Sequence, residues 1–301
     1  MKYTPHHSEI QFLICFNYGL NVYCGYEVKN MSKKLDLWTN DRNFNEEDVE
    51  DQKRYFVVEH NDLITKARHD LNAQELKIMD FVVSKIKPDD EKFNIIDTSM
   101  YEISQVLGMK RSGRTYSQLA SNLNDLRKKD VFIYNDEERS VTMTGWFETA
   151  KVWENGQIQL RINEDFAPYL LTLRGNYTQH LLFDTVQLSS RYSILLYKLM
   201  READKDKGKK ITILRGTPEE FKEWLGAPKS YSFNSLKTQV LQKALNEINL
   251  KINDMHLEIV TAKRGRKIVQ VDIRNTFIIQ NKSDNNSKSN PELKVPLYNW
   301  L

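Results

Sequence analysis

Cysteine is scarce in this chain, since only Cys15 and Cys24 occur among 301 residues. Two cysteines near one end cannot cross-link a chain of this length, which excludes a disulfide-rich secreted scaffold and favours a reducing cytosol. Their Cys-x8-Cys spacing lies near no Cys or His pair except His6 and His7, so the zinc-ligand pattern is incomplete. We therefore expect two ordinary thiols and no metal site.

A long hydrophobic run is missing as well. The most apolar early stretch, residues 11–26, is interrupted by Asn17, Gly19, Asn21 and Gly25, and it lacks the basic start and cleavage site of a signal peptide. With 40% hydrophobic and 28% charged residues, the composition is typical of a soluble globular protein. The length suffices for two ordinary domains.

Motifs of enzymes are also absent. The sequence contains no G-x-x-x-x-G-K-[ST] phosphate loop, and no two histidines flank a single apolar residue, the spacing that would hold a metal beside a DNA-cleaving tyrosine. Carboxylate pairs such as Asp89-Asp90 and Glu219-Glu220 fit turns or helix ends. We expect that the chain is not an enzyme and that it has no catalytic residues and no cofactor.

The net charge is only +3, but the basic residues are concentrated in two places. Residues 107–129 hold six Lys or Arg against one acid, and residues 229–267 hold eight against three, whereas residues 46–51 form an acidic block. Concentrated positive charge is typical of a nucleic-acid-binding surface. The distribution of charge is therefore more informative than its sum.

The order of predicted elements occurs twice. In each copy a helix is followed by a short strand, a helix that ends at Leu-Gly, a link, a further helix and a β-hairpin. The first copy comprises residues 76–86, 93–99, 100–107, 116–129 and 130–147, and the second comprises 191–204, 211–214, 218–225, 235–249 and 256–273. The distance in sequence from the cap of the first helix to the glycine of the Leu-Gly helix end is 36 residues in one copy (72 to 108) and 37 in the other (189 to 226). Pattern and spacing together indicate a tandem duplication.

Local signals mark the ends of these elements. Asn72 and Glu75 form a capping box, and Thr217 followed by Pro218 starts a helix. Gly108 and Gly226 are helix stops. Between the copies, Asn-Gly at 155–156 is a strong hairpin turn.

A helix, a tight turn, a second helix and a hairpin form a winged helix-turn-helix, whose second helix enters the major groove of DNA while the hairpin wing touches the flanking backbone. The predicted fold class is therefore α+β, with tandem winged helix-turn-helix domains related by internal duplication. We expect residues 1–54 to be a partly disordered N-terminal extension, in which Met31 is a candidate for the native start, and residues 281–301 to be a flexible tail. Residues 55–175 would form the first winged-helix domain, for dimerisation and DNA backbone contact, and 176–280 the second, for the main specific DNA binding.

Candidate DNA-binding residues lie around the start of each second helix and in the second wing, because cations, hydroxyls and amides there can contact phosphates or base edges. They are Lys110, Arg111, Arg114, Tyr116, Ser117 and Gln118 in the first copy, Lys229, Ser230, Tyr231, Ser232, Asn234, Lys237 and Gln239 in the second, and Lys263, Arg264, Arg266 and Lys267 in the wing.

Each candidate group has a structural alternative. The wing cations at 263–267 could form a solvated hairpin tip, although four charges in five residues repel one another until phosphate or solvent neutralises them. The aromatic residues Tyr116, Tyr231 and Phe233 could pack beneath their helix starts. The cations at 127–129 could compensate a helix dipole instead of binding DNA, and both interpretations stay open.

These residues resemble a known family. The segments at 61–86, 156–173, 189–203 and 219–226, with Tyr-Ser-Gln-Leu at 116–119 and Asp-Leu-Arg at 125–127, are similar to the iteron-binding Rep family of theta-type plasmid replication initiators. The resemblance spans residues 55–275 and rests on the order of elements. It implies two winged-helix domains that bind repeated double-stranded origin DNA and recruit host initiation and helicase proteins. It also implies a homodimer in equilibrium with monomer, in which the dimer represses the initiator's own gene, and it places the main specific contacts between Lys229 and Lys243 and in the following wing.

Two other functions remain open on the sequence alone. A transcriptional regulator without a replication role would present the same DNA-binding surface. A structural tandem winged helix that binds proteins would show no salt-dependent affinity for DNA. The apolar end of the tail, residues 296–301, could dock on a replication partner or fold back onto the body.

Overall fold

The structure, a computed structural model, describes residues 51–87, 90–110, 112–204 and 211–277. Most of the expected N-terminal extension, both cysteines and the tail with its apolar end lie outside these residues. In the part that is described, no helix combines the length and the apolar character that crossing a bilayer requires.

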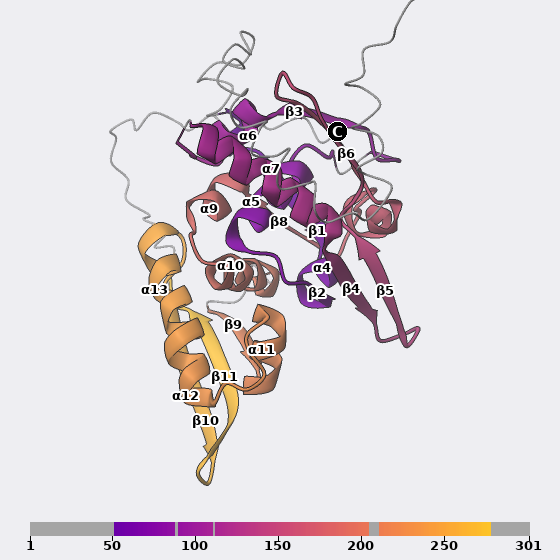
Figure 1. Cartoon of the computed structure of the whole chain (residues 1–301). Helices are drawn as coiled ribbons and strands as arrows, with labels where there is room; N and C mark the ends of the chain where they lie inside the picture. The colour runs from indigo at the N-terminus through magenta and orange to yellow at the C-terminus, as the bar shows by residue number, and fades with distance from the viewer. Residues whose placement is uncertain (1–50, 88–89, 111, 205–210, 278–301) are drawn as a thin grey trace, which may run out of the picture.

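The first half contains the indigo to pink elements of Figure 1. They are β1 (Phe56–His60), α4 (Asn61–Thr65), β2 (Ala67–Arg68), α5 (Ala73–Val83), β3 (Ile96–Ser99), α6 (Met100–Val106), α7 (Gly113–Lys128), β4 (Asp130–Asn135), β5 (Ser140–Gly145), β6 (Phe147–Val152), β7 (Gln157–Ile162), η2 (Glu164–Phe166), α8 (Ala167–Leu170), β8 (Tyr177–Leu181) and α9 (Leu182–Gln187).

The second half is simpler. It contains α10 (Arg191–Ala203), β9 (Thr212–Gly216), α11 (Pro218–Leu225), α12 (Phe233–Leu236), η3 (Lys237–Leu241), α13 (Gln242–Lys251), β10 (Leu257–Arg264) and β11 (Lys267–Asn275). The segments α12, η3 and α13 form one continuous helix, with a π-helical turn at η3.

Both copies of the predicted element order are present, so the tandem winged-helix fold is confirmed. The capping signals are confirmed as well. Asn72 Oδ1 accepts a hydrogen bond from the Glu75 backbone N–H at 3.0 Å, and Glu75 Oε2 accepts one from the Asn72 backbone N–H at 2.7 Å. Gly108 and Gly226 have positive φ angles of 64° and 59°, which is the left-handed conformation that ends a helix.

The two copies differ in how their strands pair. In the second copy β9 pairs with β11 of the wing, giving a sheet of order β10-β11-β9. In the first copy β3 pairs instead with β7, with Ile96 opposite Leu160, and the wing β4–β5 pairs with the two-residue strand β2. The predicted hairpin at 155–156 causes this difference, because β6–β7 supplies the partner that β3 would otherwise find in its own wing.

Helix α10 lies between the two halves. It packs against α4, α5 and β8 of the first half and against β9, α11 and α13 of the second (Figure 1). Strand β8, which follows the expected domain boundary at residue 175, pairs with β1. The first half therefore continues past that boundary at least as far as residue 181.

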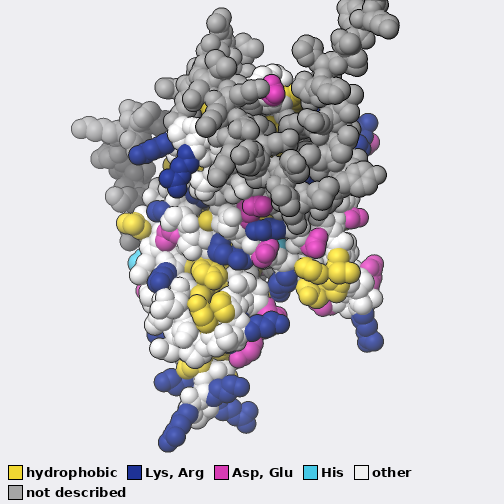
Figure 2. Space-filling model, in the orientation of Figure 1, with side chains coloured by type: hydrophobic (Ala, Val, Ile, Leu, Met, Phe, Trp, Pro, Cys, Tyr) yellow, Lys and Arg dark blue, Asp and Glu magenta, His cyan; other side chains and the backbone are white. Residues whose placement is uncertain are grey.

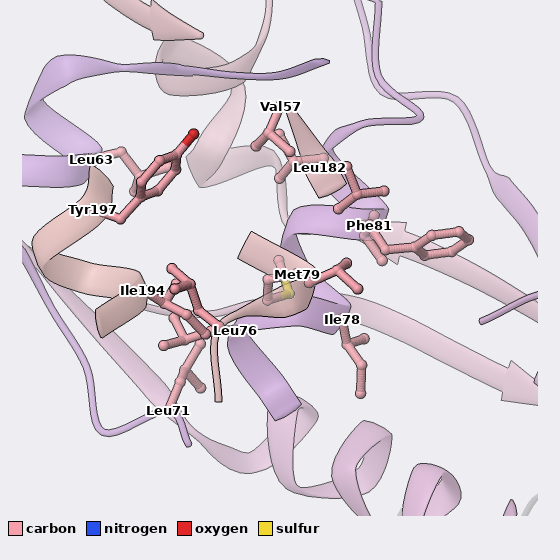
Figure 3. Packing of buried hydrophobic residues seen from close by; sticks show 14 of the residues in the cluster. Val57, Leu63, Leu71, Leu76, Ile78, Met79, Phe81, Leu182, Ile194 and Tyr197 are labelled. Atoms are coloured by element: carbon pink, nitrogen blue, oxygen red, sulfur yellow. The ribbon is translucent and has the colours of Figure 1, made fainter. Parts of the chain in front are cut away.

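The hydrophobic core runs through this junction. Phe81 and Ile78 of α5 and Ile194 and Tyr197 of α10 are completely buried, and Figure 3 shows their side chains among neighbours from β1 and α9. Burial of apolar area of this kind is the main stabilising contribution to the fold.

A buried ion-pair cluster also fixes α10 to the first half. Lys198 Nζ of α10 lies 2.6 Å from Asp80 Oδ1 of α5 and 2.8 Å from Glu59 Oε1 of β1. Burial by itself would lower the pKa of Lys198, but Asp80 and Glu59 outweigh it and raise that pKa. Burial would raise the pKa of Asp80, but Lys198 and His180 lower it to about 2. Glu59, Asp80 and His180 lie close enough together to hold a cation, and here the Lys198 ammonium supplies the positive charge.

Candidate nucleic-acid interface

The turn between the two helices of the second copy is tightly closed. Gly226 ends α11, and the Ala227 backbone N–H donates to the Lys222 carbonyl at 2.8 Å. The Tyr231 backbone N–H then donates to the Pro228 carbonyl at 3.0 Å. Ser232 caps the next helix by accepting a hydrogen bond from the Ser235 backbone N–H at 3.1 Å. This geometry presents the start of the second helix at the surface.

The second helix of this copy, residues 233–251, places the predicted DNA-binding residues on or near its outer side. Its inner side is buried and consists of Leu236, Val240, Leu241, Ala244, Leu245 and Ile248. The predicted residues Lys229, Ser230, Ser232, Asn234 and Gln239 are exposed, whereas Tyr231 and Lys237 are half-buried. Tyr231 and Phe233 both pack against the core, which favours the packing alternative for these two aromatic side chains.

The wing of the second copy carries the most concentrated charge. Lys263, Arg264, Arg266 and Lys267 are all exposed at the tip of β10–β11. Gly265 forms the turn between the strands with a φ of 63°, which glycine adopts without strain. Figure 2 shows these dark blue side chains projecting from the lower tip of the molecule. A polyanion can reach all four charges without moving the body of the domain.

The first copy is built differently at its helix start. Ser112 caps α7 by accepting a hydrogen bond from the Thr115 backbone N–H at 3.1 Å. The helix therefore begins at Gly113, three residues before the start expected at residue 116. Lys110, Arg114 and Gln118 are exposed, and Ser117 is half-buried with its hydroxyl donating to the Gly113 carbonyl. Arg111 lies outside the described residues.

Tyr116 departs from its predicted role. Only 5% of Tyr116 is exposed, and its ring belongs to the hydrophobic core. Within α7, residue 116 lies on the same helix face as Leu119 and Leu123, which are also buried. The packing alternative is therefore favoured for Tyr116 in this structure.

Two cations at the end of α7 lie in different environments. Lys129 Nζ lies 2.7 Å from the buried Glu75 carboxylate of α5, so it stabilises the body of the first domain. Lys128 is exposed in the last turn of the helix, where it can balance the dipole or contact phosphate.

Four further positions on the outer side of the second copy are exposed, namely Thr238, Gln242, Lys243 and Asn246. The first three lie within the stretch from Lys229 to Lys243 that the family resemblance implies, and Asn246 lies beyond it. The spacing of the buried residues 236, 240, 244 and 248 already indicates which side faces outward, and that signal could have found them.

Comparisons with known proteins agree with this arrangement. A family model described as "Initiator Replication protein, WH1" matches residues 56–201, and one described as "Initiator Rep protein, WH2" matches residues 217–275. The Pi initiator protein, solved in complex with iteron DNA, has 20% sequence identity and a TM-score of 0.62 over 74% of this chain and 97% of that one. Domains 2 and 3 of RctB match with 13% identity and a TM-score of 0.40 over 72% of this chain and 82% of that one. Because the two family models together cover more than half of its length, this chain belongs to the initiator replication protein family.

Proposed function

We propose that this chain is a plasmid replication initiator that binds repeated origin sequences in double-stranded DNA. The observation that carries the proposal is the pairing of a basic wing at 263–267 with an exposed recognition helix immediately upstream. Two such winged-helix units in one chain can contact a longer site than one unit can. The family membership and the fold shared with an initiator that was solved on iteron DNA support the same function.

Within this proposal the second domain makes the main specific contacts and the first domain contacts the DNA backbone. The second domain has the basic wing, whereas the first wing turns through Asp136, Glu137 and Glu138. Acidic side chains at a wing tip are repelled by phosphate. The chain would act by binding DNA and recruiting host initiation and helicase proteins in the bacterial cytoplasm, without catalytic chemistry of its own.

Footprinting of the purified protein on the DNA that flanks its gene tests this function. Protection of several direct repeats beside an A·T-rich tract is expected for an initiator. Protection of a single palindrome, with no repeats, would instead support a transcriptional regulator. Absence of any salt-dependent DNA affinity would contradict both functions.

We also propose that the first wing forms a homodimer surface. Its exposed face carries two cross-strand apolar pairs, Phe132 opposite Met143 and Tyr134 opposite Val141. These side chains are 36%, 70%, 44% and 44% exposed in that order, and Figure 2 shows hydrophobic side chains gathered over this region. A face of this kind favours association with a second apolar surface. The dimer would repress the initiator's own gene, as the family resemblance implies.

Sedimentation of the wild-type protein and of Met143→Lys tests the dimer. The substitution adds a charge to the centre of the apolar face and is expected to shift the equilibrium toward monomer. The control is Thr142→Lys on the same strand. An unchanged dimer content in Met143→Lys would place the dimer contact elsewhere.

A further inference from the structure

The second recognition helix carries a row of four exposed polar side chains on its outer face. Asn234, Thr238, Gln242 and Asn246 are all exposed and follow one another at intervals of four residues. We call them the outer row. Of these four, only Asn234 is among the DNA-binding residues predicted at the start of the helix.

The π-helical turn keeps the outer row on one face. In a regular α-helix a step of four residues overshoots a full turn by about 40°, so three steps rotate the last side chain about 120° away from the first. In this helix the Gln242 backbone N–H donates to the Lys237 carbonyl, five residues earlier. Such a turn contains more residues than an α-helical one and offsets part of the overshoot. The same face therefore continues from Asn234 to Asn246.

The chemistry of the outer row suits contact with base edges. Asn and Gln side chains pair bidentately with adenine in the major groove, and hydroxyl groups accept or donate to several bases. Gln242 Nε2 donates to Asn246 Oδ1 at 2.9 Å. This bond holds the two amides side by side and leaves an acceptor on Gln242 and a donor on Asn246 for another partner.

The charge around the outer row favours an approaching polyanion. Residues 227–246 contain no Asp or Glu. The next acid, Glu247, faces the body of the protein, where its carboxylate accepts a hydrogen bond from the Ser189 backbone N–H. Beside the row, Lys243 Nζ donates to Gln239 Oε1 at 2.8 Å, which places a cation next to the amides. A solvated helix face on a protein with 41 acidic residues is not expected to exclude acids over this length.

We infer that Gln242 and Asn246 are specificity-determining residues that each contact a base pair of the repeated site. The inference rests on the proposed function. Gln242 lies within the stretch from Lys229 to Lys243 that the family resemblance implies, and Asn246 extends the recognition surface three residues beyond that stretch. Four residues of helix span about 6 Å and one base pair about 3.4 Å, so the two contacted base pairs should lie about two positions apart.

Binding measurements on the full chain test the inference. A duplex is first selected by the wild-type protein from a random-sequence pool. Affinities of wild type, Gln242→Ala and Asn246→Ala are then measured for this duplex, for a shuffled duplex and for a set with one base pair changed at a time. The matched control is Gln179→Ala, which removes an exposed glutamine of β8.

Each variant is expected to lower the ratio of selected to shuffled affinity about 5- to 150-fold, the range for loss of one bidentate contact. Each variant should lose discrimination at a single base pair, and the base pairs affected by the two variants should lie about two positions apart. The affinity of each variant for the shuffled duplex and its melting temperature should stay at the wild-type values. Gln179→Ala should behave like the wild type in all measurements. If both variants keep the wild-type ratio, or lose selected and shuffled affinity equally, the inference is wrong although the proposed function stands. If no sequence is enriched by the wild type, the sequence-specific binding on which the proposed function depends fails, and the inference fails with it.

Discussion

Glu247 of α13 binds the chain immediately before α10, at Ser189 and at the N-cap residue Ser190. One carboxylate oxygen accepts a hydrogen bond from the Ser189 backbone N–H at 2.7 Å and also from its hydroxyl, and the other accepts one from the Ser190 backbone N–H at 3.2 Å. Lys251 Nζ donates to the same carboxylate at 2.7 Å. Since α10 packs against both halves, this contact sets the position of the recognition helix relative to the first domain.

Replacing this carboxylate should weaken the fold in a pH-dependent way. Burial by itself would raise the pKa of Glu247, but hydrogen bonds from Lys251 and Ser189 lower it to about 2, below the ordinary 4.5. A lowered folded-state pKa contributes stability that is present above pH 4.5 and is lost as the pH falls toward 2. We expect Glu247→Gln to reduce the free energy of unfolding by about 1–3 kcal/mol at pH 7.

Urea unfolding at several pH values measures this effect. The difference between wild type and Glu247→Gln should shrink as the pH falls from 4.5 toward 2, because the wild type then loses the same interaction. Glu258→Gln is the control, since the Glu258 side chain is 57% exposed. A difference that is independent of pH would show that the charge of Glu247 is not what stabilises the cap.

Lys198 is expected to be essential for the stability of the first domain. Its ammonium neutralises Asp80 and Glu59, which are 1% and 5% exposed. Lys198→Met leaves two buried carboxylates without their cation, which costs about 3–5 kcal/mol in comparable buried pairs. The double variant Lys198→Met, Asp80→Asn removes one of these charges and should cost less than the sum of the two single variants. Additive losses in denaturant unfolding would contradict the coupling.

Much of the fold was predictable because its signals are local. The Asn72–Glu75 capping box and the glycines at 108 and 226 set helix ends through contacts within a few residues of each other. The pairing of β3 with β7 was not predictable, because its partners Ile96 and Leu160 are 64 residues apart and either wing strand offered an alternative.

The candidate interface was predictable in its charges but not in its helix geometry. The wing cations at 263–267 follow directly from composition and a turn glycine. The π-helical turn at Lys237–Leu241 has no sequence signature, so the extension of the outer face to Asn246 required the structure. The sequence leaves Tyr116 open as a DNA contact or a packing residue. In the structure Ser112 caps α7, the helix begins at Gly113, and the Tyr116 ring packs in the core.

The two Leu-Gly stops should respond differently to the same substitution. Gly108 and Gly226 have nearly equal φ angles of 64° and 59°, so alanine strains the backbone at both, by about 1 kcal/mol. A Cβ at Gly108 meets nothing within 4 Å, whereas at Gly226 it lies 2.8 Å from Arg191 Nη2. That guanidinium donates to the His69 carbonyl of the first half.

We therefore expect Gly226→Ala to destabilise the protein more than Gly108→Ala in urea unfolding. Gly175→Ala is the control, because Gly175 has no neighbour within 4 Å and no positive φ. Equal losses at residues 108 and 226 would mean that Arg191 moves aside at no cost and that its contact with His69 contributes nothing.

The basic wing makes a prediction about the salt dependence of binding. Replacing Lys263, Arg264, Arg266 and Lys267 with alanine removes four exposed charges and leaves the strands β10 and β11 paired along their buried length. Each lost phosphate contact reduces the slope of log affinity against log salt concentration by about 0.9, so the slope should fall by up to about four units.

Because phosphate contacts carry no sequence information, the affinities of the wing variant for the selected and the shuffled duplex should fall by the same factor. The control is Arg174→Ala with Lys92→Ala, because these two cations are exposed and lie outside the candidate DNA-binding residues. An unchanged slope in the wing variant would show that the wing does not contact the DNA backbone, and the specific affinity would then depend on the recognition helix alone.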